Sequence, residues 1–106
     1  MPKVQRVALL SNPQSPASIA ELPRIRAFCA KHPHVFHYEV EEAGQIGRAM
    51  RSIARVRPTL LAINGNEPTV AAALVELARL CAVLPPVAVI GGGKLDEVKR
   101  AVEAGG

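Results

Sequence analysis

The stretch Thr59-Leu60-Leu61-Ala62-Ile63, followed by Asn64-Gly65-Asn66-Glu67-Pro68-Thr69, decides the fold of this chain. Its first five residues form a short apolar run, which is the pattern of a buried strand. The next six residues contain a glycine turn, and residues 70–80 then repeat apolar side chains at helical spacing. A buried strand, a glycine turn and a helix in this order indicate one unit of an α/β protein with a parallel sheet.

The same strand–helix unit recurs along the chain. We predict strands over residues 4–10, 35–40, 59–63 and 87–90. We predict helices that begin near Glu21–Pro23, at Ile46, at Val70 and at Leu95. Strands that alternate with helices form parallel sheets through right-handed crossovers. We therefore expect one α/β domain over residues 1–106, with three α/β/α layers and a four-stranded, mostly parallel sheet.

Two of the predicted helices have an apolar face that we expect to be buried. In the first, this face consists of Leu22, Ile25, Phe28, Cys29 and His32. In the third, it consists of Val70, Leu74, Leu77 and Cys81, and the alanines 71–73 allow close packing.

The composition limits the classes of function. The chain has 106 residues, of which 49% are hydrophobic and 3% aromatic, so we expect an aliphatic core. So few rings argue against a protein that binds single-stranded nucleic acid by stacking its bases. The net charge is +4, and Arg48, Arg51 and Arg55 fall along one side of the second helix. This stripe is either the solvated face of an amphipathic helix or a contact for an anionic partner.

Cysteine and histidine spacing do not predict a metal site. Cys29 and Cys81 each stand among apolar residues, as small buried side chains do in a reduced protein. His32, His34 and His37 belong to a helix end, a turn and a strand, so we expect no shared zinc ion. There is no signal peptide pattern and no run of 18 apolar residues. We therefore expect a cytoplasmic protein without a membrane span.

Three loops are the candidate site, because ligands of α/β sheets bind at the carboxyl ends of the strands. They cover residues 11–15, 64–69 and 91–94. Glycine turns and helix N-termini hold phosphate through backbone N–H groups, although tight turns after strands need glycine without any ligand. The candidate nucleotide or anion contacts are Asn12, Gly65, Asn66, Glu67, Thr69, Gly93 and Lys94.

The loops and the strands before them resemble a known family. The segments 7–15, 61–70 and 85–90, with the glycine turn after residue 90, are similar to the catalytic domain of bacterial diacylglycerol kinase-like lipid kinases. That family shares a superfamily with sphingosine kinases and NAD kinases. The resemblance covers nearly the whole chain, but only the N-terminal half of such an enzyme. It implies a nucleotide-binding fold, ATP with Mg²⁺ as cofactor, and a separate β-rich lobe.

The chain departs from this family in its phosphate loop, which reads Gly-Gly-Asp-Gly-Thr in the family. Gly65 and Thr69 match its first and last residues, whereas Asn66, Glu67 and Pro68 replace the three between them. Proline removes an N–H donor and fixes the backbone where the family has glycine. In the family's later Pro-x-Gly-Thr-x-Asn turn, Gly93 matches the glycine and Lys94 replaces the threonine.

These departures predict a degenerate or truncated nucleotide-binding domain that is inactive as a kinase on its own. A β-rich lobe supplied by another chain would then complete the site.

Two other classes remain open. The end of the chain, residues 87–105, is similar to that of a response-regulator receiver domain. A receiver needs an acidic pair after its first strand and an aspartate after its third, where this chain has Ser11-Asn12 and Asn64. A protein-interaction module that is not phosphorylated is therefore one alternative, and a non-catalytic α/β scaffold is another. We also expect the second or fourth strand to be an exposed edge, which predicts a homodimer.

Overall fold

The sheet is the centre of the computed structural model, which describes residues 6–90 and 94–105. Its strands are β1 (Val7–Ser11), β2 (Val35–Glu39), β3 (Leu60–Asn64) and β4 (Val87–Val89). They lie in the order β2-β1-β3-β4, and every neighbouring pair is parallel. The expected α/β class is confirmed, and the sheet is entirely rather than mostly parallel.

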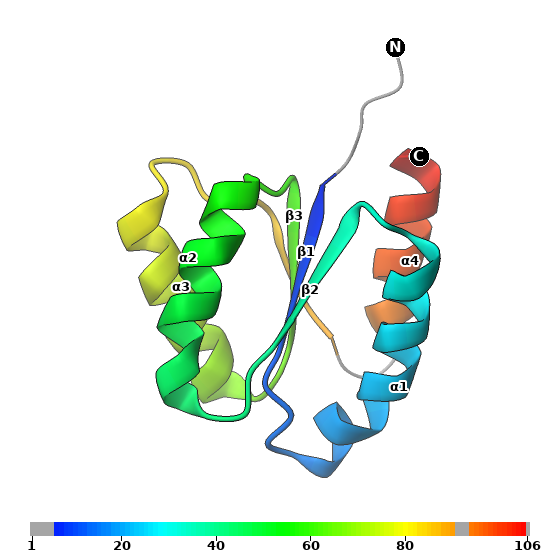
Figure 1. Cartoon of the computed structure of the whole chain (residues 1–106), viewed down its shortest axis with the longest axis horizontal. Helices are drawn as coiled ribbons and strands as arrows, with labels where there is room; N and C mark the ends of the chain where they lie inside the picture. The colour runs from blue at the N-terminus through cyan, green and yellow to red at the C-terminus, as the bar shows by residue number, and fades with distance from the viewer. Residues whose placement is uncertain (1–5, 91–93, 106) are drawn as a thin grey trace.

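Two pairs of helices cover the two faces of the sheet. The helices are α1 (Pro16–Lys31), α2 (Ile46–Val56), α3 (Glu67–Leu80) and α4 (Lys94–Gly105), and a short 3-10 turn, η1 (Ala43–Gln45), precedes α2. Helices α2 and α3 pack on one face, and α1 and α4 on the other (Figure 1). The described residues contain no helix long and apolar enough to cross a bilayer.

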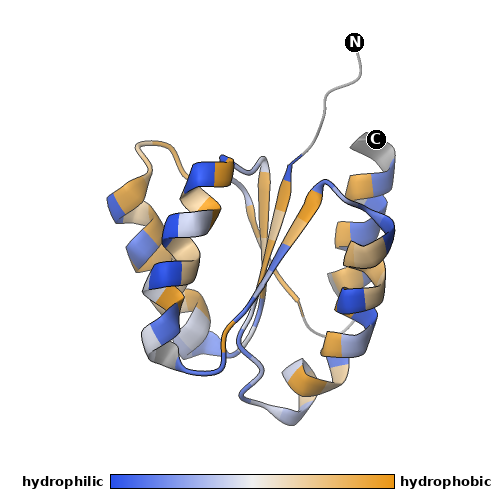
Figure 2. Cartoon of the chain, in the orientation of Figure 1, coloured by the Kyte–Doolittle hydropathy of each residue, from blue (hydrophilic) through white to orange (hydrophobic). Residues whose placement is uncertain are grey.

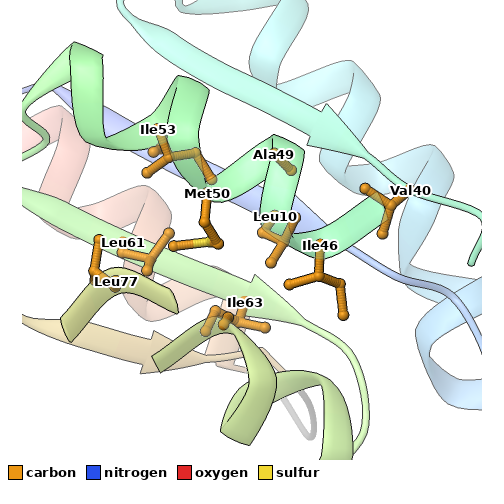
Figure 3. Close-up of a cluster of buried hydrophobic side chains, with 11 residues drawn as sticks. Leu10, Val40, Ile46, Ala49, Met50, Ile53, Leu61, Ile63 and Leu77 are labelled. Carbon is orange, nitrogen blue, oxygen red and sulfur yellow. The ribbon is translucent and has the colours of Figure 1, made fainter. Parts of the chain in front are cut away.

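The apolar core is divided by the sheet into two clusters. All five residues of the central strand β1 are buried, and its alternate side chains enter opposite clusters. Leu10 joins Met50, Ile53 and Leu77 between the sheet and helices α2 and α3 (Figure 3). The second cluster lies beneath α1 and α4 and contains Val7, Leu9, Ile25, Phe28, Leu95 and Val98. Figure 2 shows the corresponding pattern, with mainly apolar strands and helices of mixed polarity.

Helix α1 begins earlier than the sequence predicted. It starts at Pro16 rather than near Glu21–Pro23, because Ser15 caps it. The Ser15 hydroxyl accepts from the Ser18 N–H at 3.2 Å, and the Ser18 hydroxyl accepts from the Ser15 N–H at 3.0 Å. This reciprocal pair is a capping box. Pro23 therefore lies inside the helix at an exposed position. It has no N–H to donate to the carbonyl of Ile19, one turn earlier in the helix.

The buried face of α3 also differs from the prediction. The helix begins at Glu67 rather than at Val70, and its fully buried residues are Thr69, Ala73 and Leu77. Val70 and Cys81 are only partly buried against the first cluster. The small side chain of Ala73 lets α3 approach the sheet closely. The buried face of the helix is therefore centred on Ala73, and the larger Leu74 is only partly buried. In α1, Cys29 and His32 are likewise only partly buried.

The two leucines near the end of α3 provide a matched test of this core. Leu77 is fully buried, whereas 43% of Leu80 is exposed. We expect Leu77→Ala to lower the free energy of unfolding by about 2–5 kcal/mol, and Leu80→Ala by roughly 0.5 kcal/mol or less. Urea unfolding followed by circular dichroism measures both. Equal losses for the two variants would contradict this placement of α3.

Candidate functional site

The strand order places the candidate site between β1 and β3. From β1 the chain passes through α1 to β2, and from β2 it returns through α2 to β3 on the other side of β1. The carboxyl ends of β1 and β3 are therefore the topological switch point of the sheet, where doubly wound proteins bind ligands. Here the loop after β1 meets the turn after β3, since the Asn12 N–H donates to the Asn64 carbonyl at 2.9 Å. Two of the three predicted loops are therefore neighbours.

A chain of hydrogen bonds closes this junction, and we call it the Asn12–Thr69–Asn66 clasp. Asn12 Nδ2 donates to Thr69 Oγ1 at 2.9 Å, and that hydroxyl donates to Asn66 Oδ1 at 2.7 Å. Asn12 and Thr69 are each only 2% exposed. On its outer side, Asn12 Oδ1 accepts from Gln14 Nε2 at 3.0 Å. The predicted ligand contacts Asn12, Asn66 and Thr69 thus come together, and they bind one another.

The clasp also uses the N–H groups that open α3. Asn66 is the N-cap, and its side chain accepts from the Thr69 N–H at 3.2 Å. Pro68 has no N–H, and the Val70 N–H donates to the Asn66 carbonyl. Within the first turn, Glu67–Val70, only the Glu67 N–H keeps no partner in the described residues. Glu67 itself belongs to this turn, and its negative charge interacts favourably with the positive end of the helix dipole.

Gly65 is required by the clasp itself. A Cβ atom at this position would lie 2.8 Å from Thr69 Cγ2 and 2.9 Å from Thr69 Cβ. These distances are shorter than carbon atoms tolerate, so any larger residue would push Thr69 out of the clasp. The glycine that matches the first position of a phosphate loop therefore has a structural reason without a phosphate.

The third predicted loop is not placed. Gly93 lies outside the described residues, and Lys94 is the first residue of α4, with a side chain that is also outside the description. The described part of the site therefore consists of the β1–α1 loop and the β3–α3 turn.

A second polar cluster lies beside the switch point and was not found in the sequence. Ser11 Oγ and His37 Nε2 are 2.8 Å apart across β1 and β2. His37 Nδ1 lies 3.7 Å from Glu39 Oε2. Arg26 of α1 binds Glu39 through two hydrogen bonds, of 3.0 Å and 2.6 Å. The sequence signal was the i, i+2 spacing of His37 and Glu39 on one strand, which places both on the face covered by α1.

The order serine, histidine, carboxylate resembles a hydrolase triad, but the geometry favours a structural role. Ser11 is fully buried, so a substrate cannot approach its hydroxyl. Glu39 is engaged by Arg26, whose hydrogen bond lowers the pKa of that carboxyl below its ordinary value. Burial lowers the pKa of His37, which keeps the imidazole neutral as a partner of Ser11. Glu39 is therefore half of a solvent-exposed ion pair with Arg26.

Asn64 has one polar atom without a partner. Its Nδ2 donates to the Ser18 carbonyl at 3.0 Å, which ties β3 to the first turn of α1. Its Oδ1 is buried and accepts no hydrogen bond. An unpaired buried acceptor of this kind costs about 1–3 kcal/mol unless a water reaches it.

The histidines and cysteines are placed as follows. The rings of His32 and His34 meet edge to face at 5.8 Å, while His37 lies in the cluster with Ser11. Within residues 6–90 and 94–105, no group of three or more His, Cys, Asp or Glu side chains is arranged to hold a metal ion. Both cysteines are free thiols, and burial raises the pKa of Cys29 to about 11. The Cys29 thiol therefore stays protonated and weakly nucleophilic at neutral pH.

Comparisons with protein-family models, with curated proteins and with solved structures found no match to this chain.

The hydroxyl at the centre of the clasp can be tested by substitution. Thr69→Val keeps the shape of the side chain but leaves the buried Asn12 Nδ2 without its acceptor. We expect it to lower the free energy of unfolding by about 1–3 kcal/mol. Thr69→Ser keeps the hydroxyl and should cost less, roughly 1 kcal/mol. If the serine variant has the lower free energy of unfolding in urea, the hydrogen bonds of Thr69 do not stabilise this junction.

The buried histidine predicts a pH dependence of stability. Burial lowers the pKa of His37 from its ordinary value of 6.5. Just below pH 6.5 the native state therefore binds fewer protons than the unfolded chain, so the free energy of unfolding falls as the pH drops through this region. The lowered pKa of Glu39 acts separately, below its ordinary value of 4.5. Urea midpoints between pH 7.5 and 5 should fall less in His37→Gln, and an unchanged slope would exclude His37 as the cause.

Proposed function

We propose that this chain is a degenerate form of a lipid-kinase-like nucleotide-binding domain, in which the nucleotide site is closed, so that it does not transfer phosphate on its own and acts as a non-catalytic α/β module. The observation that carries the proposal is the Asn12–Thr69–Asn66 clasp. It occupies the switch point with the chain's own polar side chains, at the place where the resembled family holds nucleotide.

The chemistry of phosphate binding supports this proposal. A phosphate at a helix N-terminus is held by several free N–H groups and by the positive end of the helix. In α3, the N–H groups of Thr69 and Val70 are already bonded, and Pro68 has none. The carboxylate of Glu67 adds a negative charge in the same turn. Both effects weaken the site for a nucleotide.

The strand order favours a second candidate function, a receiver-like interaction module that is not phosphorylated. The order β2-β1-β3-β4 corresponds to the first four strands of the flavodoxin-like arrangement, which receiver domains also have. The positions that would carry the phosphorelay acids are occupied by Ser11, Asn12 and Asn64, and all three are buried. Both candidates are non-catalytic modules. They differ in the family that the chain resembles, which is lipid kinases for the first and receiver domains for the second.

Nucleotide binding by the whole chain tests the proposal. We expect millimolar Mg-ATP or Mg-ADP to leave the melting temperature unchanged, because the clasp leaves too few donors at the switch point. A ligand at a hundred times its Kd would stabilise the fold by about 2.7 kcal/mol, which is several degrees for a domain of this size.

Amide chemical shifts locate any binding that does occur. In the same titration, we expect the NMR signals of residues 64–70 to stay in place. A rise in melting temperature together with movement of these signals would overturn the proposal and indicate a working nucleotide site. A rise without such movement would place the nucleotide elsewhere and leave the closed turn intact.

A further inference from the structure

The outer edge of β2 is open to another strand. β2 lies at one end of the sheet, and it has five residues, whereas β4 at the other end has three. An unpaired strand edge presents backbone N–H and C=O groups that another polypeptide can bond. Natural proteins often shield such an edge, and in the described residues no strand or helix pairs with this one.

The direction of the backbone groups follows from one hydrogen bond. The Val40 N–H, just after β2, donates to the Ser11 carbonyl of β1 at 2.8 Å. Because backbone groups alternate in direction along a strand, Phe36 and Tyr38 bond toward β1 as well. The N–H and C=O groups of His37 and Glu39 therefore point away from the sheet, toward any strand that would be added.

Arg48 of α2 lines a cavity beside this edge, together with Tyr38 and Val40. Arg48 and Arg55 lie two turns apart on α2, and both are exposed. Neither forms an ion pair with an acidic side chain in the part of the chain that the structure describes. Arg51 leans toward α3 instead, since its guanidinium reaches Gly47 beside Glu76. Arg48, at the edge, and Arg55, further along α2, thus have no ion-pair partner among the described residues.

Strand and helix together form a groove. A cavity of about 400 Å³ is lined on one side by residues 37–40, Glu39 among them, and on the other by Gln45, Arg48, Ala49 and Ser52. Phe36 extends the apolar floor along β2 and is 37% exposed. The groove therefore combines an open backbone edge, an aromatic floor and the side chain of Arg48, with Arg55 two turns further along α2.

The other face of the same edge has a different charge. Glu39 and His37 point toward α1, where Arg26 already neutralises Glu39. A strand added to β2 would thus meet positive charge on its α2 side and a compensated pair on its α1 side. Glu41 and Glu42 follow β2, so acidic positions fit best beside Phe36 and Tyr38 rather than at the end of the strand.

We propose that β2 is a docking edge for an extended acidic segment of a partner protein, which adds to the sheet as a fifth strand. Its side chains alternate, with acidic residues toward Arg48 and Arg55 and neutral residues toward α1. A polypeptide fits this surface better than nucleic acid or a lipid bilayer does, because only a polypeptide matches the backbone donors and acceptors of the edge. The inference goes beyond the proposed function, since it concerns a different edge of the sheet, and it can fail while the nucleotide experiment succeeds.

Synthetic peptides test the strand and the charge separately. The probe is a fluorescein-labelled hexapeptide of alternating glutamate and valine, measured by fluorescence anisotropy at low salt with the whole chain. We expect the glutamate–valine peptide to bind the chain and the matching lysine–valine peptide not to bind it. Only every second residue of a strand bonds to a given neighbour. N-methylation of one alternate set of amides should therefore abolish binding, while methylation of the other set should not.

Substitutions identify the surface. We expect Arg48→Gln with Arg55→Gln to weaken binding about tenfold, because the uncompensated charges are removed. The matched control, Lys31→Gln with Arg100→Gln, removes the same charge from α1 and α4 and should weaken binding less, because neither side chain lines the groove. Circular dichroism checks that both variants fold.

Three outcomes would overturn the proposal. The first is a peptide that binds equally well with either set of amides methylated. The second is an equal loss of affinity in the double variant of Arg48 and Arg55 and in the control double variant of Lys31 and Arg100. The third is stronger binding to duplex DNA or to vesicles containing phosphatidylserine than to the glutamate–valine peptide, which would make the groove a general polyanion surface.

Discussion

The structure depends on one constraint, which is that an all-parallel sheet must be covered on both faces. β1 carries apolar side chains toward both α-helical layers, so neither face of the sheet can be left to water. The helices supply the cover in pairs, α2 with α3 and α1 with α4 (Figure 1). The same constraint buries both faces of the sheet, so the sheet itself is open only at the ends of its strands and along its two outer edges.

At the carboxyl ends of the strands, the polar residues form hydrogen bonds that join one part of the fold to another. Asn12 and Thr69 join the loop after β1 to the start of α3, and Asn64 joins β3 to the start of α1. A nucleotide site needs the same kinds of groups, but it needs them free. The chain therefore keeps the residue types of a phosphate-binding turn while their hydrogen bonds are made internally. In a site of this kind, which atoms remain uncommitted matters more than which residues are present.

Much of the fold could be predicted from the sequence because strand–helix alternation is a local pattern. The start of α1 could not, since Pro23 imitates a first helical turn, while the real cap is a pair of serines, Ser15 and Ser18. At the turn of Gly65 two of the three predicted loops meet, and the closure of that turn depends on Thr69, four residues later. The Ser11–His37 contact joins residues 26 apart and follows only from the register of β1 on β2. Gly93 stays a prediction.

The position of β1 has a consequence for how the chain acquires its shape. β1 is made first, but it is sealed between β2 and β3, and Val7 pairs with Leu60, 53 residues later. Among the described residues no hairpin gives the sheet a local nucleus, because every strand pair there is parallel and joined through a helix. Folding must therefore close long loops before the central strand is buried, which slows parallel sheets. On a ribosome, the apolar strand Val7–Ser11 would stay covered on one edge only until β3 emerges, which leaves it open to a chaperone during that interval.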